Sequence, residues 1–154
     1  MKLEPLFYAK ENKLFKIDDN SQFDCSSLKK FELPWSQIEF EEDKYNEECL
    51  AQLRDDLKKL EIHNEFAVIV PKVDKAFDSQ EQKEAFINTF NHCARRIKDC
   101  ISVAGFELAP ELCAQGFAED SISSDFMNTL AIKHAQYVYF VSQTSEVPGT
   151  IVKY

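Results

Sequence analysis

Apolar runs alternate with helical stripes along most of the chain. Residues 66–70 are apolar at every position, which is typical of a strand buried in a parallel sheet, and Pro71 ends the run. Residues 101–108 and 137–141 are mostly apolar and are also expected to form strands, and a short extended segment is expected at 150–152. Between these runs, apolar residues at helical spacing predict three helices. Their stripes are Leu50, Leu53, Leu57 and Leu60, then Phe86, Phe90, Cys93, Ala94 and Ile97, then Phe126, Met127, Leu130 and Ala131.

The first forty residues follow a different pattern. Residues 6–9 and 14–17 are short β-prone runs separated by the polar residues 10–13, which predicts a hairpin. A polar loop follows, and residues 31–35 then have the composition of a strand. Pro34 in that run indicates an edge or the end of a strand, because proline cannot donate a hydrogen bond to a neighbouring strand.

The alternation of strands and helices predicts βαβ units and a parallel sheet. We expect one α/β domain spanning residues 1–154. Within it, residues 1–28 form an N-terminal β-hairpin and a loop, and residues 29–154 form about four βα units. A chain of 154 residues can bury a sizeable core without disulfides or metals.

The charge balance narrows the classes of partner. The chain has 27 acidic and 18 basic residues, which gives a net charge of −9. Proteins that bind nucleic acid or anionic membranes instead have clusters of Lys and Arg. We therefore expect no nucleic-acid and no membrane partner. No apolar run approaches the ~20 residues of a membrane span, and no signal-peptide pattern is present, so a cytoplasmic protein is the default expectation. The acidic run 39–43 is expected to precede a helix, whose positive end it would complement.

The spacing of cysteine, glycine and histidine argues against a bound cofactor or metal. Five cysteines without a closely spaced pair predict reduced thiols rather than disulfides or a zinc site, and Cys49 and Cys93 lie on apolar helix faces. With only three glycines, the common phosphate-binding loops cannot be formed. His63, His92 and His134 share no ligand spacing. We expect no cofactor and no metal.

Two carboxylates near the end of one predicted strand are the candidate catalytic residues. Strict alternation along residues 103–108 places Val103, Gly105 and Glu107 on one face. If the chain stays extended, Glu111 follows Glu107 onto that side. Ligands of parallel α/β sheets bind beyond the carboxyl ends of the strands, where these side chains would lie. The alternative is a solvated carboxylate at a strand end together with an acid at a helix start.

The same residues carry a family resemblance. Residues 103–112, V-A-G-F-E-L-A-P-E-L, resemble the V-x-G-F/Y-E-L-x-N-E-P segment of the cellulase-type glycoside hydrolases, which fold as (β/α)8 barrels. The run W-S-Q-I-E from Trp35 to Glu39 resembles the W-x-x-I-E/D segment of that family. The likeness covers residues 31–142. It implies a half-barrel or TIM-barrel-like fragment, with Glu111 at the position of the general acid/base.

The chain also departs from that family. Pro110 and Leu112 replace the Asn and Pro of the motif, and Pro71 stands where the family often has a histidine. A complete barrel needs ~250 residues, and the late strand that carries the family's nucleophile has no counterpart here. The resemblance therefore implies a fold relative rather than an active enzyme.

Two functions of different classes follow. The first is a glycoside-hydrolase-like domain, non-catalytic or carbohydrate-binding, that holds an oligosaccharide with Trp35, Tyr137 and Tyr139 near adjacent strand ends; the alternative for these aromatic residues is a place in the core. The second is a non-enzymatic interaction or regulatory module. A half-barrel leaves open sheet edges, which the hairpin, the C-terminal tail or a second subunit can cover, and the last of these predicts a homodimer. A third and weaker hypothesis is an active glycosidase that uses Glu107 and Glu111 together, which requires the two carboxylates to lie close to each other.

Overall fold

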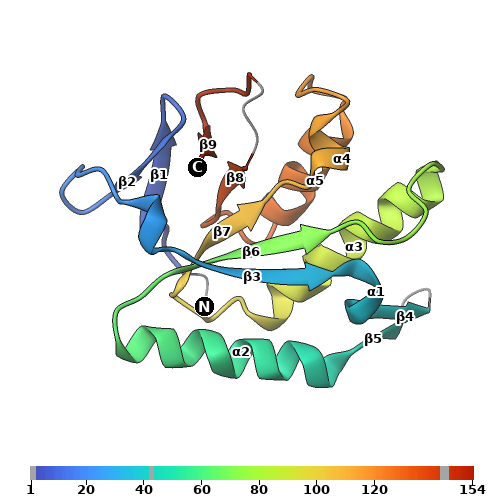
Figure 1. The fold of residues 1–154 in the computed structure, drawn as a ribbon, viewed down its shortest axis with the longest axis horizontal. Coiled ribbons are helices and arrows are strands. Elements are labelled where there is room, and N and C mark those ends of the chain that lie inside the picture. Colours follow the sequence, from blue (N-terminus) through green and yellow to red (C-terminus); the bar gives the residue numbers. More distant parts are fainter. Residues whose placement is uncertain (1–2, 42–43, 143–145) are drawn as a thin grey trace.

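A five-stranded parallel sheet forms the centre of the computed structural model, which describes residues 3–41, 44–142 and 146–154. Each strand pairs with the next one along the chain (Figure 1). The strands are β3 (Lys29–Pro34), β6 (Ala67–Lys72), β7 (Val103–Glu107), β8 (Val138–Val141) and β9 (Ile151–Lys153). The predicted α/β class with a parallel sheet is confirmed, and the expected short segment near residue 151 forms the fifth strand.

Three helices cover one face of this sheet. They are α2 (Glu47–Ile62), α3 (Gln80–Arg96) and α5 (Ile122–Ala131), and each connects two neighbouring strands. Their apolar stripes form one core with the sheet residues Ala67, Ile69 and Phe106. Right-handed crossovers between strands in sequence order place all helices on the same side. The helix beginnings have capping residues, of which the Ser79–Gln82 capping box of α3 was predicted from the sequence.

The N-terminal hairpin covers the other face of the sheet (Figure 1). It consists of β1 (Phe7–Lys10) and β2 (Lys13–Lys16), as predicted. Phe7 and Leu14 pack against the sheet residues Val68, Ala104, Phe140 and their neighbours in a second core. In a complete barrel this face would line the interior. Here the hairpin closes it.

The hairpin turn also covers the outer edge of β9. Asn12, in a left-handed conformation with φ 65°, donates from its side-chain amide to the carbonyls of Pro148 and Ile151, both at 2.8 Å. The backbone N–H of Lys153 donates in turn to the Asn12 carbonyl at 3.1 Å. One sheet edge is therefore occupied by the protein's own chain, whereas β3 forms the opposite edge.

A β-bulge in β7 changes which side chains share a face. The pairing with β6 moves from Ala67–Val103 to Val68–Gly105, so that Ala104 has no partner of its own. Strict alternation, expected from the sequence, is therefore wrong for this strand. Val103 faces the helices together with Phe106, while Ala104 and Glu107 face the hairpin side.

Short elements lie at the carboxyl ends of the strands. After β3 come α1 (Trp35–Ile38), β4 (Glu39–Glu41) and β5 (Lys44–Tyr45), and α4 (Pro110–Cys113) follows β7. A 3-10 helix, η1 (Cys25–Ser27), precedes β3. Trp35, expected at the end of a strand, begins α1 instead. Part of the acidic run at 39–43 forms β4, and residues 42–43 lie outside the described part of the chain.

In that described part, none of the helices has the length and apolar character needed to cross a membrane.

Candidate functional site

The two candidate catalytic carboxylates lie in different environments. Glu107 ends β7 and is buried, with its carboxylate on the hairpin side of the sheet. The chain does not stay extended beyond it, because α4 begins at Pro110. Glu111 lies in the first turn of α4 and is exposed to solvent. The expectation that Glu111 follows Glu107 onto one side is therefore wrong, since it depended on an extended backbone.

The carboxylate of Glu107 is held by two side chains from other strands. The hydroxyl of Tyr154 donates to its Oε1 at 2.8 Å, and the ammonium of Lys30 lies 3.7 Å from the same oxygen. Lys30 also lies 4.1 Å from the centre of the Tyr154 ring. Burial, and next the hydrogen bond to Glu107, raise the pKa of Tyr154. These contacts satisfy a buried charge.

Tyr137 and Tyr139 do not lie at the carboxyl edge of the sheet. Tyr137 precedes β8, at the amino edge, and its ring packs 5.1 Å from that of Phe106 in the helix-side core. Tyr139 packs against the same core, with its hydroxyl 3.5 Å from the carbonyl of Met127. Burial raises the pKa of both phenols. Their surroundings match the core alternative considered for them.

Trp35 instead forms a buried polar cluster with two charged residues at the carboxyl edge. Its indole Nε1 donates to Glu39 Oε1 at 2.9 Å, and only 4% of Glu39 is exposed. The ammonium of Lys75 lies 3.2 Å from the same oxygen and also donates to the Glu39 carbonyl at 2.8 Å. It sits 4.9 Å from the centre of the indole ring as well. The Trp–Glu spacing of four residues spans α1, which brings the two side chains together.

A pocket of about 390 Å³ opens beside this cluster. The pocket lies where β3 and β6 end and α3 begins. Its lining residues are Trp35, Glu39, Lys75, Ala76, Glu81, Gln82 and Ala85. The loop after β6 is fixed to α1 by the backbone N–H of Ser36, which donates to Asp74 at 2.9 Å. We define the Trp35 pocket as this cavity with its lining residues.

The sequence pointed to only part of the Trp35 pocket. Trp35 was a candidate ligand contact, and Glu39 belonged to the motif that resembles a glycosidase segment. Lys75, Glu81 and Gln82 were not among the candidates. The available signal was their position after a buried strand and at a capped helix start, where ligands of parallel sheets bind.

No match emerges when the chain is compared with models of protein families or with curated proteins. Its function therefore has to be argued from the geometry of the sites. Over residues 3–41, 44–142 and 146–154, no three side chains of His, Cys, Asp or Glu are grouped so that they could hold a metal ion.

Proposed function

We propose that this protein is a glycoside-hydrolase-like domain that binds carbohydrate without hydrolysing it, and that the Trp35 pocket is the binding site. The supporting observation is the buried Glu39 carboxylate, which joins Trp35 and Lys75 at the carboxyl edge of the sheet. This is the edge at which parallel α/β folds bind their ligands.

The pocket carries groups suited to sugar hydroxyls, which both donate and accept hydrogen bonds. Glu81 supplies acceptors, and Lys75, which donates to the carbonyl and carboxylate of Glu39, has a further N–H to donate. The Oε1 of Gln82 accepts from the backbone N–H groups of Asp78 and Ser79, which leaves its amide nitrogen to donate. Ala76 and Ala85 contribute apolar surface for a sugar ring.

The partners and the exposure of the carboxylates argue against hydrolysis. Retaining hydrolysis needs two carboxyl groups about 5 Å apart that flank one glycosidic bond. Glu107 is engaged by Tyr154 and Lys30, and Glu111 is exposed on α4. In the pocket, Glu39 already accepts from Trp35 and Lys75.

A thermal-shift screen against oligosaccharides, read together with Trp35 fluorescence, tests the proposal. Trp35 is the chain's single tryptophan, so its emission reports on the pocket directly. A ligand at 100 times its Kd is expected to add ~2.7 kcal/mol of stability. Glu81→Ala, which removes this acceptor from the pocket, should reduce the shift, whereas Glu111→Ala, the matched change of an exposed carboxylate elsewhere, should preserve it. The absence of any shift at millimolar oligosaccharide contradicts the binding site, and release of reducing sugar contradicts the non-catalytic assignment.

Self-association along β3 is a second candidate function, supported by the backbone of that strand. The N–H of Lys29 donates to Phe66 at 2.9 Å, so alternate residues from Lys29 face β6. Lys30 and Glu32 consequently direct their backbone groups away from the sheet, at an edge that can accept another strand. In an antiparallel pair centred on Phe31, Lys30 lies opposite the partner's Glu32, and the reciprocal pair forms as well. This register is complementary in charge to itself.

Charge reversal distinguishes this register from nonspecific association. Glu32→Lys should give a monomer in sedimentation velocity, because four lysines would meet in the pair. Lys30→Glu also removes the cation beside Glu107, so this variant is used only in a mixture with Glu32→Lys. The mixture should form a heterodimer, since each lysine then meets a glutamate. Glu111→Lys, a matched change far from β3, should leave the wild-type dimer intact. A wild-type chain that is monomeric at several hundred micromolar rules out the second candidate, and circular dichroism of each variant verifies its fold.

A further inference from the structure

Two adjoining pockets lie at the amino edge of the sheet, opposite the Trp35 pocket. The basic pocket, of about 560 Å³, is bordered by the end of α3 and the segment between α5 and β8, and its cationic lining residues are Arg95, Lys98 and Lys133. The apolar pocket, of about 190 Å³, lies between the N-terminal segment and the start of β7. Leu3 and Gln136 line both cavities, so the two pockets adjoin each other at these residues.

The charge of the basic pocket runs against that of the whole chain. Although the net charge is −9, the described residues that line this pocket include no carboxylate. Many of the cations in the described ranges form ion pairs with carboxylates. Arg95, Lys98 and Lys133 form none there. The neighbouring Asp99 is turned towards Arg54, which contacts it with Nε at 3.2 Å from Oδ1. A concave surface of one sign concentrates the field that attracts an anion.

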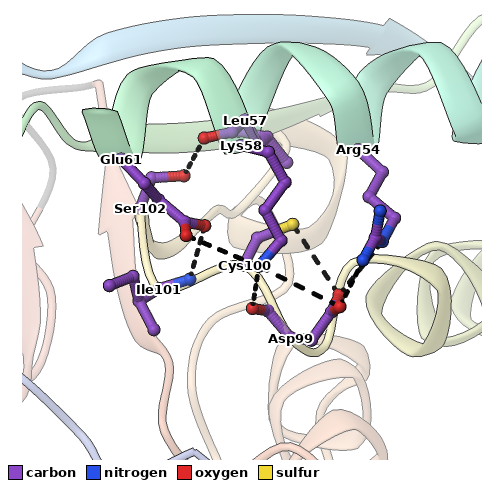
Figure 2. Close-up of polar contacts among 8 residues, drawn as sticks. All are labelled: Arg54, Leu57, Lys58, Glu61, Asp99, Cys100, Ile101 and Ser102. Carbon is purple, nitrogen blue, oxygen red and sulfur yellow. Dashed lines mark hydrogen bonds and ion pairs between the residues drawn. The ribbon is translucent and has the colours of Figure 1, made fainter. Parts of the chain in front are cut away.

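Contacts from α2 hold the segment from Asp99 to Ser102 in place (Figure 2). Cys100 and Ile101 of this segment line the apolar pocket. Lys58 Nζ donates to the Asp99 carbonyl at 2.7 Å, and Ser102 Oγ donates to the Leu57 carbonyl at 2.8 Å. The backbone N–H of Ile101 donates to Glu61 at 3.1 Å. These bonds fix both ends of the segment, so that the Ile101 side chain is presented to the apolar pocket before any ligand arrives.

Exposed apolar side chains gather around the same pockets. Over the described residues, six large apolar side chains are exposed, and three of them, Leu6, Ile101 and Ile132, line these two cavities. Ile132 is 73% exposed. Apolar surface concentrated beside a polar rim is typical of a binding site, whereas isolated exposed residues are common on any protein.

We propose that the two pockets together bind a single-chain amphiphilic anion, a molecule with a carboxylate or phosphate head and a hydrocarbon tail. The head lies in the basic pocket against Arg95, Lys98 and Lys133. The tail crosses Leu3 into the apolar pocket. Glu4, the one carboxylate among the described residues that line the apolar pocket, repels a negatively charged head there and so favours this orientation.

Titration calorimetry with three probes below their micelle concentrations tests the proposal. Octyl phosphate carries both parts of the ligand, inorganic phosphate carries only the head, and tetraethylene glycol monooctyl ether carries the tail with a neutral head that is not a sugar. Octyl phosphate should bind at least about tenfold more tightly than either of the other two, because it alone gains both contacts. Its affinity should also fall as the salt concentration rises.

Variants separate the contributions of head and tail. Lys98→Ala combined with Lys133→Ala should weaken octyl phosphate binding about tenfold and leave binding of the neutral octyl ether unchanged. Ile101→Ser should weaken both octyl compounds. The matched controls are Lys83→Ala and Ile62→Ser, which remove a cation from the first turn of α3 and an exposed isoleucine from the end of α2. Both controls should bind like the wild-type chain, and circular dichroism checks that every variant is folded.

Several outcomes overturn the proposal. Equal affinity for octyl phosphate and the neutral octyl ether removes the role of the cations. Equal affinity for octyl phosphate and inorganic phosphate removes the role of the apolar pocket. Binding to vesicles of anionic phospholipid without binding of octyl phosphate assigns the patch to a membrane surface instead. Unchanged octyl phosphate binding in the Lys98/Lys133 double variant places the ligand elsewhere.

Discussion

The hydroxyl of Tyr154 donates a 2.8 Å hydrogen bond to the buried carboxylate of Glu107, which joins the segment after β9 to the end of β7. Lys30, from β3, completes the group by contacting both residues. β3, β7 and the segment after β9 therefore meet at one buried carboxylate. The carboxylate that the sequence marks as a candidate catalyst belongs to a cluster that holds the sheet together.

Removal of the Tyr154 hydroxyl should destabilise the protein. Tyr154→Phe keeps the ring against Phe140 but leaves Glu107 without its closest donor. An unsatisfied buried acceptor costs about 1–3 kcal/mol. Urea unfolding at pH 8 should show a loss of that size in the free energy of unfolding. Tyr8→Phe, which removes an exposed hydroxyl hydrogen-bonded to Asn20, is the control and should change it little.

The effect of this substitution should shrink at alkaline pH. Burial, followed by the hydrogen bond to Glu107, raises the pKa of Tyr154 above its ordinary value of 10.0. The unfolded chain releases this proton near pH 10, while the folded chain retains it. The stabilisation is therefore complete below about pH 10 and is lost as the pH rises further. Tyr137 and Tyr139 titrate in both chains, so the difference between wild type and Tyr154→Phe isolates Tyr154. A difference that is constant from pH 8 to 11 contradicts the assignment.

Gly105 should tolerate no side chain. A Cβ at this position would lie 1.6 Å from the carbonyl oxygen of Val138, in the strand that pairs with β7. Gly105→Ala must separate β7 from β8, and we expect a loss of more than about 4 kcal/mol or a failure to fold. At Gly149 the nearest atom would be 3.5 Å from the new Cβ, so Gly149→Ala should stay within about 0.5 kcal/mol of the wild-type chain. Soluble expression and urea midpoints compare the two; similar midpoints would show that β7 and β8 are not so close.

Periodicity predicted the elements of the fold but could not predict the bulge in β7. Continuous apolar residues at 66–70 and helical stripes such as Leu50, Leu53 and Leu57 report burial directly, and those elements were confirmed. A bulge depends instead on how β7 pairs with β6. This pairing involves two strands, so the sequence of β7 alone cannot predict it. This single extra residue reversed the face expected for Val103 relative to Glu107.

The candidate site was predicted less completely than the fold, for a related reason. The sequence placed Glu107 and Glu111 together because it extended a strand through Ala109, whereas Pro110 begins a helix. Trp35 and Glu39 were joined by short-range spacing, which a sequence does record. Their contact with Lys75, 36 residues away from Glu39, depends on the packing of two loops at one sheet edge.

Two of the five cysteines should resist modification in the folded protein. Cys93 is completely buried, which raises the pKa of its thiol strongly. Burial, and next the nearby Asp99, raise the pKa of Cys100 to about 11. Because thiolates are the reactive form, a disulfide reagent at pH 8 should label neither residue before unfolding. Peptide mass spectrometry of the labelled protein reads this out. Prompt labelling of Cys93 would mean that the interface between α3 and the sheet opens readily.

The ion pair between Arg54 and Asp99 should contribute modestly to the free energy of unfolding, and only above acidic pH. The hydrogen bond from Arg54 is the main cause that lowers the pKa of Asp99. A lowered pKa gives stability that is present above the unfolded value of 3.8 and is lost as the pH falls below it. Both side chains are about half exposed, so Arg54→Met should cost no more than about 1 kcal/mol at pH 7. The cost should decrease between about pH 5 and pH 3, and Lys83→Met is the control with no such dependence. A cost that persists at pH 3 would assign it to packing.

Glu107→Gln and Glu111→Gln should separate a structural carboxylate from a solvated one. In Glu107→Gln the Tyr154 hydroxyl can still donate to the amide oxygen, but Lys30 loses its charged neighbour and the new buried NH2 group needs an acceptor. We expect this variant to lose about 1–3 kcal/mol in urea unfolding. Glu111 is exposed at the start of the short helix α4, so Glu111→Gln removes only a weak interaction with the helix end, and its loss should stay within about 0.5 kcal/mol. Equal losses in the two variants would place both carboxylates in one environment. That outcome would restore the hypothesis of a paired catalytic site, which the beginning of α4 at Pro110 argues against.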